Sequence, residues 1–72
     1  MTLKDYRKRM KLTQYEAAEQ LNIHKDYLSM IERGKRTPSY KLLTKMAKLY
    51  QTTPEELFKT ILNQTILNKS GE

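Results

Sequence analysis

The sequence predicts an all-α fold, and three observations lead to this prediction. The chain contains no valine, and apolar and polar residues do not alternate over four or more positions, so strands are not indicated. At three places a threonine stands three residues before an acidic residue, which is the capping-box pattern of a helix start. In the residues that follow each of these places, apolar side chains recur at the spacing of one helix face. The three capping boxes are Thr2 with Asp5, Thr13 with Glu16, and Thr53 with Glu56.

The first half of the chain predicts three short helices, over residues 3–10, 14–21 and 25–33. Thr2 precedes the first of them and Thr13 precedes the second. The residues expected to face inward from these helices are Leu3, Tyr6, Met10, Ala17, Ala18, Leu21, Leu28 and Ile31.

The second half predicts two further helices, over 40–50 and from Glu55 onward. Ser39 is placed to cap the first of them, and Pro54 takes the first helical position of the second, where its missing N–H costs nothing. The apolar residues that these helices use are Leu42, Leu43, Met46, Ala47, Tyr50, Leu57, Phe58, Ile61 and Leu62. Residues 1–67 are thus expected to form one domain, and residues 68–72 a flexible tail.

A very short connection separates the helices over 14–21 and 25–33, since only Asn22, Ile23 and His24 lie between them. Asparagine tolerates the positive φ that a tight turn requires, and two small residues, Ala17 and Ala18, let a second helix approach closely. This pattern is typical of a helix-turn-helix. It is equally compatible with an ordinary helical hairpin in a bundle.

The charge of the chain indicates a polyanionic partner. Lys and Arg number 14 against 8 Asp and Glu, which gives a net charge of +6. The basic residues gather in 4–11 and 33–48, where they would attract nucleic acid or an anionic membrane surface, or simply keep a small protein in solution. No apolar run is as long as a membrane span and no signal peptide is recognisable, so we expect a soluble, cytoplasmic protein that does not enter a membrane.

Catalysis and metal binding are not expected from these residues. The chain has no cysteine, a single histidine at His24 without a pair of acids near it, and no Gly-rich phosphate loop. We therefore expect no enzyme activity, no cofactor, no metal site and no small-molecule substrate.

A series of short motifs follows a fixed order along the chain. Leu12-Thr13-Gln14 opens the helix over 14–21, an alanine-rich stretch runs to Leu21, and Glu32-Arg33-Gly34 is followed by Pro38-Ser39. Over about residues 3–58 this series resembles the Cro and phage-repressor (XRE-like) helix-turn-helix family of DNA-binding proteins. The resemblance implies a compact five-helix, lambda-repressor-like domain in which the helix over 25–33 lies in the major groove. It also gives Gly34 the left-handed conformation that ends this helix.

The resemblance implies which side chains contact double-stranded DNA. The residues that would read base edges, all on the outward face of the helix over 25–33, are Lys25, Asp26, Ser29 and Met30. The residues that would bind phosphates are Gln14, His24, Tyr27, Arg33, Lys35 and Arg36. Arg7 and Glu32 match positions that pair with each other in the family, as a structural ion pair between the first and third helices.

Several of these residues have an alternative role in the fold. Lys25 suits a phosphate equally well, Asp26 would stabilise the helix N-terminus, and Met30 would fill the core. Tyr27 would either bind a phosphate or pack against the helix over 40–50. His24 departs from the serine or threonine that is usual in the family at this cap.

The function implied by the resemblance is sequence-specific transcriptional regulation. The simplest form is a repressor that binds an inverted-repeat operator as a homodimer, of bacterial, phage or plasmid type and associated with the nucleoid. The apolar stripe that continues past the family's usual end would form a dimer or partner surface, or would only lengthen a core helix. It consists of Leu57, Phe58, Ile61, Leu62 and Ile66. The alternatives are an antitoxin-like protein with a protein partner, or an interaction or membrane-surface module that does not bind DNA.

Overall fold

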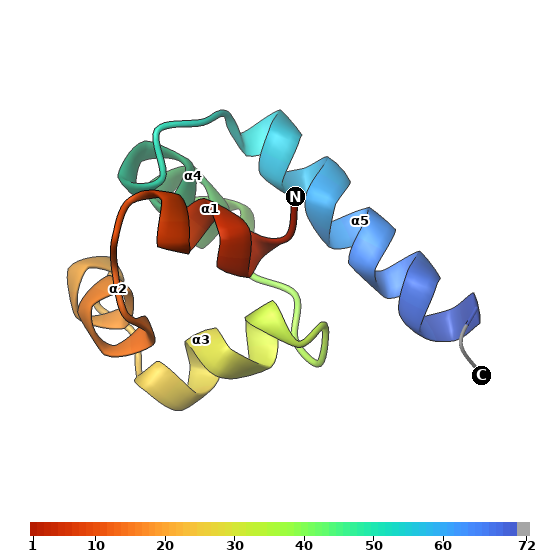
Figure 1. Cartoon of the computed structure of the whole chain (residues 1–72), viewed down its shortest axis with the longest axis horizontal. Coiled ribbons are helices and arrows are strands. Elements are labelled where there is room, and N and C mark those ends of the chain that lie inside the picture. The colour runs from red at the N-terminus through yellow and green to blue at the C-terminus, as the bar shows by residue number, and fades with distance from the viewer. Residues whose placement is uncertain (71–72) are drawn as a thin grey trace.

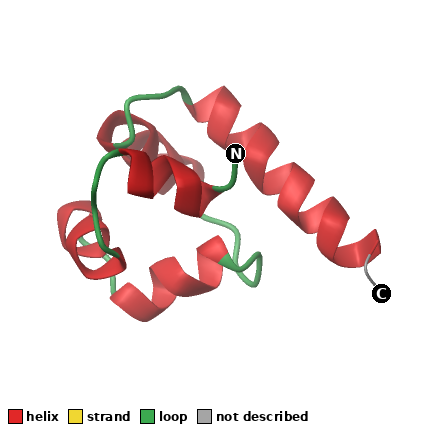
Figure 2. Ribbon diagram, in the orientation of Figure 1, coloured by secondary structure: helices red, strands yellow, loops and turns green. Residues whose placement is uncertain are grey.

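Five α-helices make up most of the described part of the chain. Short loops join them, as Figure 1 and Figure 2 show. The computed structural model describes the backbone of residues 1–70 and the side chains of residues 1–64. No strand occurs within residues 1–70, so the predicted all-α fold is confirmed. The helices are α1 (Leu3–Arg9), α2 (Gln14–Leu21), α3 (Lys25–Glu32), α4 (Tyr40–Leu49) and α5 (Pro54–Ser70).

Side-chain caps are present where the sequence predicts helix starts. At α1 the Asp5 amide donates to Thr2 Oγ1 over 3.1 Å, and the Thr2 amide donates to Asp5 Oδ2 over 2.9 Å. Thr13 and Glu16 form the same reciprocal pair at α2. Each cap satisfies amide groups that a helix start otherwise leaves unpaired. The hydroxyl groups that cap α4 and α5 are those of Ser39 and Thr53.

Residues with positive φ follow each of the first four helices. Asn22 (φ 58°) and Gly34 (φ 76°) stand where the sequence leads us to expect this conformation. Lys11 (φ 60°) and Gln51 (φ 55°) adopt it as well, although a side chain with a Cβ makes it unfavourable by about 1–2 kcal/mol. Their amides donate to carbonyls three residues earlier, and these hydrogen bonds to the last helical turn offset the cost.

The core forms both between consecutive helices and between helices that are far apart in the sequence. α2 packs against both α3 and α4, while α5 packs against α4 and α1. Ala17 and Ala18, both buried, let α2 approach its neighbours closely. The largest fully buried side chains are Leu3, Leu28, Ile31, Met46, Tyr50 and Leu57.

Tyr50 carries a hydroxyl group into this core. The oxygen is buried and has no hydrogen-bond partner among the described residues. Burial, and to a lesser degree the nearby Glu32 carboxylate, raise the pKa of the Tyr50 hydroxyl far above its ordinary value. Tyr50 is therefore neutral and serves the packing of the core.

α5 is the longest helix, and Figure 1 shows it extending at its C-terminal end beyond the other four. It continues to Ser70, so residues 68–70 are helical where we expected a tail, and residues 71–72 lie outside the described part of the chain. Within residues 1–70, no helix is both long and apolar enough to cross a membrane.

The two reciprocal caps give the protein an acid-sensitive contribution to stability. Hydrogen bonds from the Thr2 and Thr13 amides hold the pKa of the Asp5 and Glu16 carboxyls below their ordinary values of 3.8 and 4.5. A lowered pKa stabilises the fold fully above the ordinary value, and this contribution disappears as the pH falls through the lowered value. We therefore predict that Asp5→Asn combined with Glu16→Gln will reduce the loss of unfolding free energy on acidification.

Urea unfolding followed by circular dichroism from neutral to acid pH measures this effect. Glu19→Gln, which removes an exposed carboxylate elsewhere on α2, is the matched control and should follow the wild type. Parallel curves for the wild type and the double variant would contradict the prediction.

Candidate nucleic-acid interface

The helix-turn-helix consists of α2, the turn over residues 22–24, and α3. Asn22 ends α2 in the left-handed conformation, and the Ile23 amide then donates to the Ala18 carbonyl over 3.0 Å. This bond closes the turn onto the last turn of α2. Figure 1 shows α3 along the outer edge of the molecule, with its start beside α2. The turn thus leaves one whole side of α3 free of the other helices.

The two sides of α3 differ sharply in burial. Leu28 and Ile31 are buried in the core. The four residues expected to read bases lie on the other side of the helix. Among them, Lys25 and Asp26 are exposed, while Ser29 and Met30 are partly exposed. We call Lys25, Asp26, Ser29 and Met30 the α3 outer face.

For Met30 and Tyr27, the sequence allows packing inside the protein as an alternative to a contact with DNA. Met30 lies outside the core cluster, whereas Tyr27 packs partly against it. Tyr27 also lines a shallow depression together with Ser39 and Leu42, at the start of α4. Tyr27 therefore packs partly against the core on the side of α3 near the start of α4, and Met30 stays on the α3 outer face.

His24 caps α3 in place of the usual hydroxyl residue. Its Nδ1 accepts a hydrogen bond of 3.1 Å from the Asp26 amide, so the ring takes this role with Nδ1 unprotonated. Asp26 Oδ2 lies 3.7 Å from the same nitrogen. Both side chains are exposed, so the cap keeps the start of α3 accessible to a ligand.

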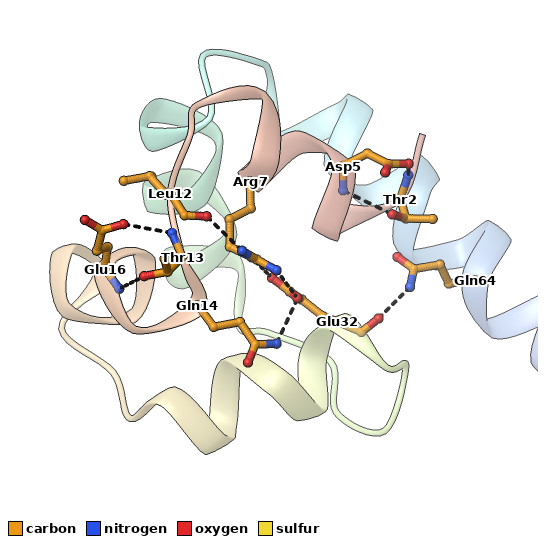
Figure 3. Close-up of polar contacts among 9 residues, drawn as sticks. All are labelled: Thr2, Asp5, Arg7, Leu12, Thr13, Gln14, Glu16, Glu32 and Gln64. Atoms are coloured by element: carbon orange, nitrogen blue, oxygen red, sulfur yellow. Dashed lines mark hydrogen bonds and ion pairs between the residues drawn. The ribbon is translucent and has the colours of Figure 1, made fainter.

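A buried ion pair holds the opposite end of α3. Arg7 on α1 donates from Nε to Glu32 Oε2 over 2.7 Å and from Nη2 to Glu32 Oε1 over 3.3 Å. The two side chains are only 6% and 4% exposed. Arg7 Nη1 donates to the Leu12 carbonyl over 2.8 Å, just ahead of α2. Arg7 and Glu32, which the family resemblance paired, thus connect α1, the start of α2 and α3 (Figure 3).

Two glutamines donate further hydrogen bonds to Glu32. Gln14 Nε2 donates to Glu32 Oε1 over 3.1 Å, and Gln64 Nε2 donates to the main-chain carbonyl of Glu32 over 2.9 Å. Gln14 is therefore turned partly inward, and its second amide N–H remains for another acceptor. Sequence reasoning missed Gln64. Its spacing from Leu57 and Ile61 could have indicated this role, because Gln64 shares a face of α5 with these two buried residues.

Basic side chains surround the C-terminal end of α3. The amides of Lys35 and Arg36 both donate to the Met30 carbonyl, over 2.8 and 3.3 Å, so this loop folds back onto α3. Their side chains are exposed, as is that of Arg33. Arg9, by contrast, donates from Nη2 to the Tyr50 carbonyl over 2.9 Å and supports the fold.

The apolar surface expected on α5 requires a correction. Leu57 and Ile61 are buried in the core of the same chain, because they face α5's neighbours, and so they are not available to a partner. Phe58 and Leu62 are 49% and 44% exposed, and the side chain of Ile66 lies outside the described residues. Tyr40, which sequence reasoning missed, is 70% exposed and lines an apolar depression of about 250 Å³ with Phe58. We call Tyr40, Phe58 and Leu62 the apolar patch.

Comparison with known proteins supports the helix-turn-helix assignment. Residues 3–57 match the family model HTH_3, described as helix-turn-helix. The chain is 39% identical over 56 residues to an uncharacterized HTH-type transcriptional regulator of Methanocaldococcus jannaschii, a match that covers 78% of this chain and 85% of that relative. Two uncharacterized HTH-type transcriptional regulators of Archaeoglobus fulgidus are 30% and 29% identical over 56 residues, covering 78% of this chain and 79% and 80% of theirs. No solved structure matches the chain.

The buried ion pair predicts strongly non-additive effects of substitution. Glu32→Leu alone leaves the Arg7 guanidinium buried without its partner, which should destabilise the fold by about 3–5 kcal/mol. Arg7→Leu alone should act similarly through the Glu32 carboxylate. The double variant removes both charges and should be more stable than either single variant.

Thermal unfolding of the three variants and the wild type measures this coupling. Arg36→Leu, which changes an exposed arginine in the loop after α3, is the control and should have a much smaller effect on the unfolding midpoint. A double variant whose destabilisation equals the sum of the two single values would refute the predicted coupling.

Proposed function

We propose that this chain, which belongs to the HTH_3 helix-turn-helix family of DNA-binding transcriptional regulators, reads a specific double-stranded DNA sequence and represses transcription by occupying it. The observation that carries the proposal is the division of α3 into a buried side and the α3 outer face. A helix fixed on one side by Leu28 and Ile31 presents its other side in a constant orientation. Such a helix fits the major groove, where base pairs are distinguished by their donor and acceptor patterns.

Each residue of the α3 outer face suits a particular base edge. Lys25 donates to guanine O6 or N7, and Asp26 accepts from cytosine N4. Met30 packs against a thymine methyl, and Ser29 donates to or accepts from either partner of a base pair. Because Lys25 and Asp26 stand in the first turn of α3, the N-terminal end of the helix enters the groove first.

Contacts with the phosphate backbone set the position of α3 without reading sequence. Lys35 and Arg36 supply positive charge beside the C-terminal end of the helix, on a loop anchored to Met30. Gln14 offers its second N–H at the start of α2, where the helix N-terminus also favours an anion. The remaining proposed phosphate contacts are His24, Tyr27 and Arg33.

We further propose that the protein binds an inverted repeat as a homodimer through the apolar patch. The exposed aromatic and aliphatic surface of Tyr40, Phe58 and Leu62 favours association. Two-fold symmetry would then place the two α3 helices in successive major grooves about 34 Å apart. The same patch also favours a second candidate function, an antitoxin-like regulator in which a different protein covers this surface.

Selection of bound sites from random duplex DNA tests the proposed function directly. The expected result is an inverted repeat whose half-sites are centred about one helical turn apart. Recovery of no common sequence, with binding that vanishes in excess competitor DNA, would overturn sequence-specific regulation and favour an interaction module.

Substitutions on α3 and on the following loop should have different effects on DNA binding. Lys35→Ala should weaken binding to all duplexes alike and reduce the salt dependence, log K against log salt concentration, by about one unit. Asp26→Ala and Met30→Ala should instead change the preferred base at one position, by about 1–3 kcal/mol. Titrations of the selected site and its single-base variants at several salt concentrations separate the two effects.

Lys59→Ala, an exposed lysine on α5 outside the proposed contacts, is the control and should leave both quantities near the wild-type values. If Asp26→Ala and Met30→Ala both behave like Lys35→Ala, the α3 outer face is not the reading surface.

The apolar patch predicts the oligomeric state. Analytical ultracentrifugation at micromolar concentrations should show a dimer for the wild type and a monomer for Phe58→Ser combined with Leu62→Ser, because both exposed apolar side chains are removed. Tyr15→Ser, which removes an exposed aromatic residue on α2, should remain dimeric. A wild-type monomer at high micromolar concentration would rule out self-association and leave the patch to a different protein.

A further inference from the structure

Gln64 connects α5 to the last residue of the recognition helix. We propose that Gln64 is a positioning residue for DNA reading, because its hydrogen bond to the Glu32 carbonyl sets the orientation of α3 relative to the rest of the domain. This inference rests on the proposed function, in which α3 reads the bases. It assigns to α5 a role in recognition that is separate from the apolar patch.

Glu32, the last residue of α3, is held at both its main-chain carbonyl and its side-chain carboxylate. The last carbonyls of a helix have no partner within the helix, and the Glu32 carbonyl accepts instead from Gln64 Nε2 over 2.9 Å. The carboxylate of the same residue is held by Arg7 and Gln14. Figure 3 shows these side chains converging on Glu32, with Gln64 approaching from the side opposite to Gln14. Three other helices therefore hold one end of α3.

The other end of α3 is held by the turn that closes onto α2, but among residues 1–64 no side chain of another helix forms a hydrogen bond with its first turn. Its cap residue His24 and the two residues that follow are exposed. α3 has eight residues and is about 12 Å long, so a tilt of about 5° at Glu32 displaces the first turn by about 1 Å. Recognition geometry must hold to within about 0.5 Å. A small change at Gln64 is thus large enough to spoil contacts made by Lys25 and Asp26.

Gln64 is also a poor residue for stability alone. It shares its helix face with Leu57 and Ile61, and its amide oxygen is buried without a hydrogen-bond partner among the described residues. An unpaired buried acceptor costs free energy, so an apolar side chain of similar length would pack at this position at least as well. The benefit of the glutamine lies in the directional bond to α3.

Gln64→Met tests the inference because methionine has a similar length and no donor. We expect its unfolding midpoint to stay close to that of the wild type, because loss of the unpaired amide oxygen offsets loss of the donor to the Glu32 carbonyl, while binding to the selected DNA site weakens about five- to tenfold. Binding to an unrelated duplex and its salt dependence should not change, so the specificity ratio falls by the same factor. Gln64→Lys restores a donor and should recover much of the ratio, and Asn63→Ala, at an exposed neighbour, should keep it.

A measurement without DNA keeps this test independent of the proposed function. Residual dipolar couplings of backbone amides report the orientation of α3 relative to α2 and α4, and Gln64→Met should change it where Asn63→Ala does not. An unchanged orientation, an unchanged specificity ratio, or a ratio that falls only together with the unfolding midpoint would each overturn the positioning role. If the wild type binds no duplex more tightly than another, the proposed function fails. The residual dipolar couplings alone then decide whether Gln64 positions α3.

Discussion

A guanidinium and a carboxylate buried together between α1 and α3 need every donor and acceptor matched, because a charge removed from water without a partner strongly destabilises a fold. In Arg7 and Glu32, each guanidinium nitrogen and each carboxylate oxygen has at least one partner. Both oxygens of the carboxylate accept from Arg7, the remaining guanidinium nitrogen donates to the Leu12 carbonyl, and Gln14 adds a further donor. Because these partners belong to α1, the loop before α2, and α2 itself, the pair can form only when all of them are in place. The position of α3 therefore depends on this one interaction more than on any single apolar contact.

The rest of the packing holds α3 against the core on one side and leaves its other side exposed. Leu28 and Ile31 belong to the same buried cluster as Met46, Tyr50 and Leu57. The short turn at Asn22 and the folded loop after Gly34 hold the two ends of the helix close to that core. No polar residue of the α3 outer face has to be buried for the fold to form. The residues of the α3 outer face can thus differ from those here without exposing the core, which separates folding from the proposed sequence preference within one helix of eight residues.

The features that the sequence predicts correctly depend on local chemistry. The capping boxes, the left-handed turn residue Asn22 and the apolar spacing of α3 each depend on residues within a few positions of one another, so their patterns are visible in the chain. The roles of Leu57, Gln64, Arg9 and Tyr40 depend instead on which helices meet. Spacing along α5 identifies an apolar stripe, but it does not say which part of the stripe α1 and α4 cover. Arg9 likewise looks like one more basic residue until the Tyr50 carbonyl is found beside it.

α5 combines three tasks on two of its faces, and this arrangement has an energetic consequence. Leu57 and Ile61 join the core, Gln64 holds the end of α3, and Phe58 and Leu62 are exposed in the apolar patch. A partner that covers the patch, whether a second copy or a different protein, therefore contacts the helix that positions the recognition helix. Any free energy by which this partner favours one orientation of α5 must also appear in DNA binding, since coupling between two sites is reciprocal. If the protein associates and reads DNA as proposed, the two are linked through the hydrogen bond between Gln64 and Glu32, and the strength of that link is limited to what one such bond contributes.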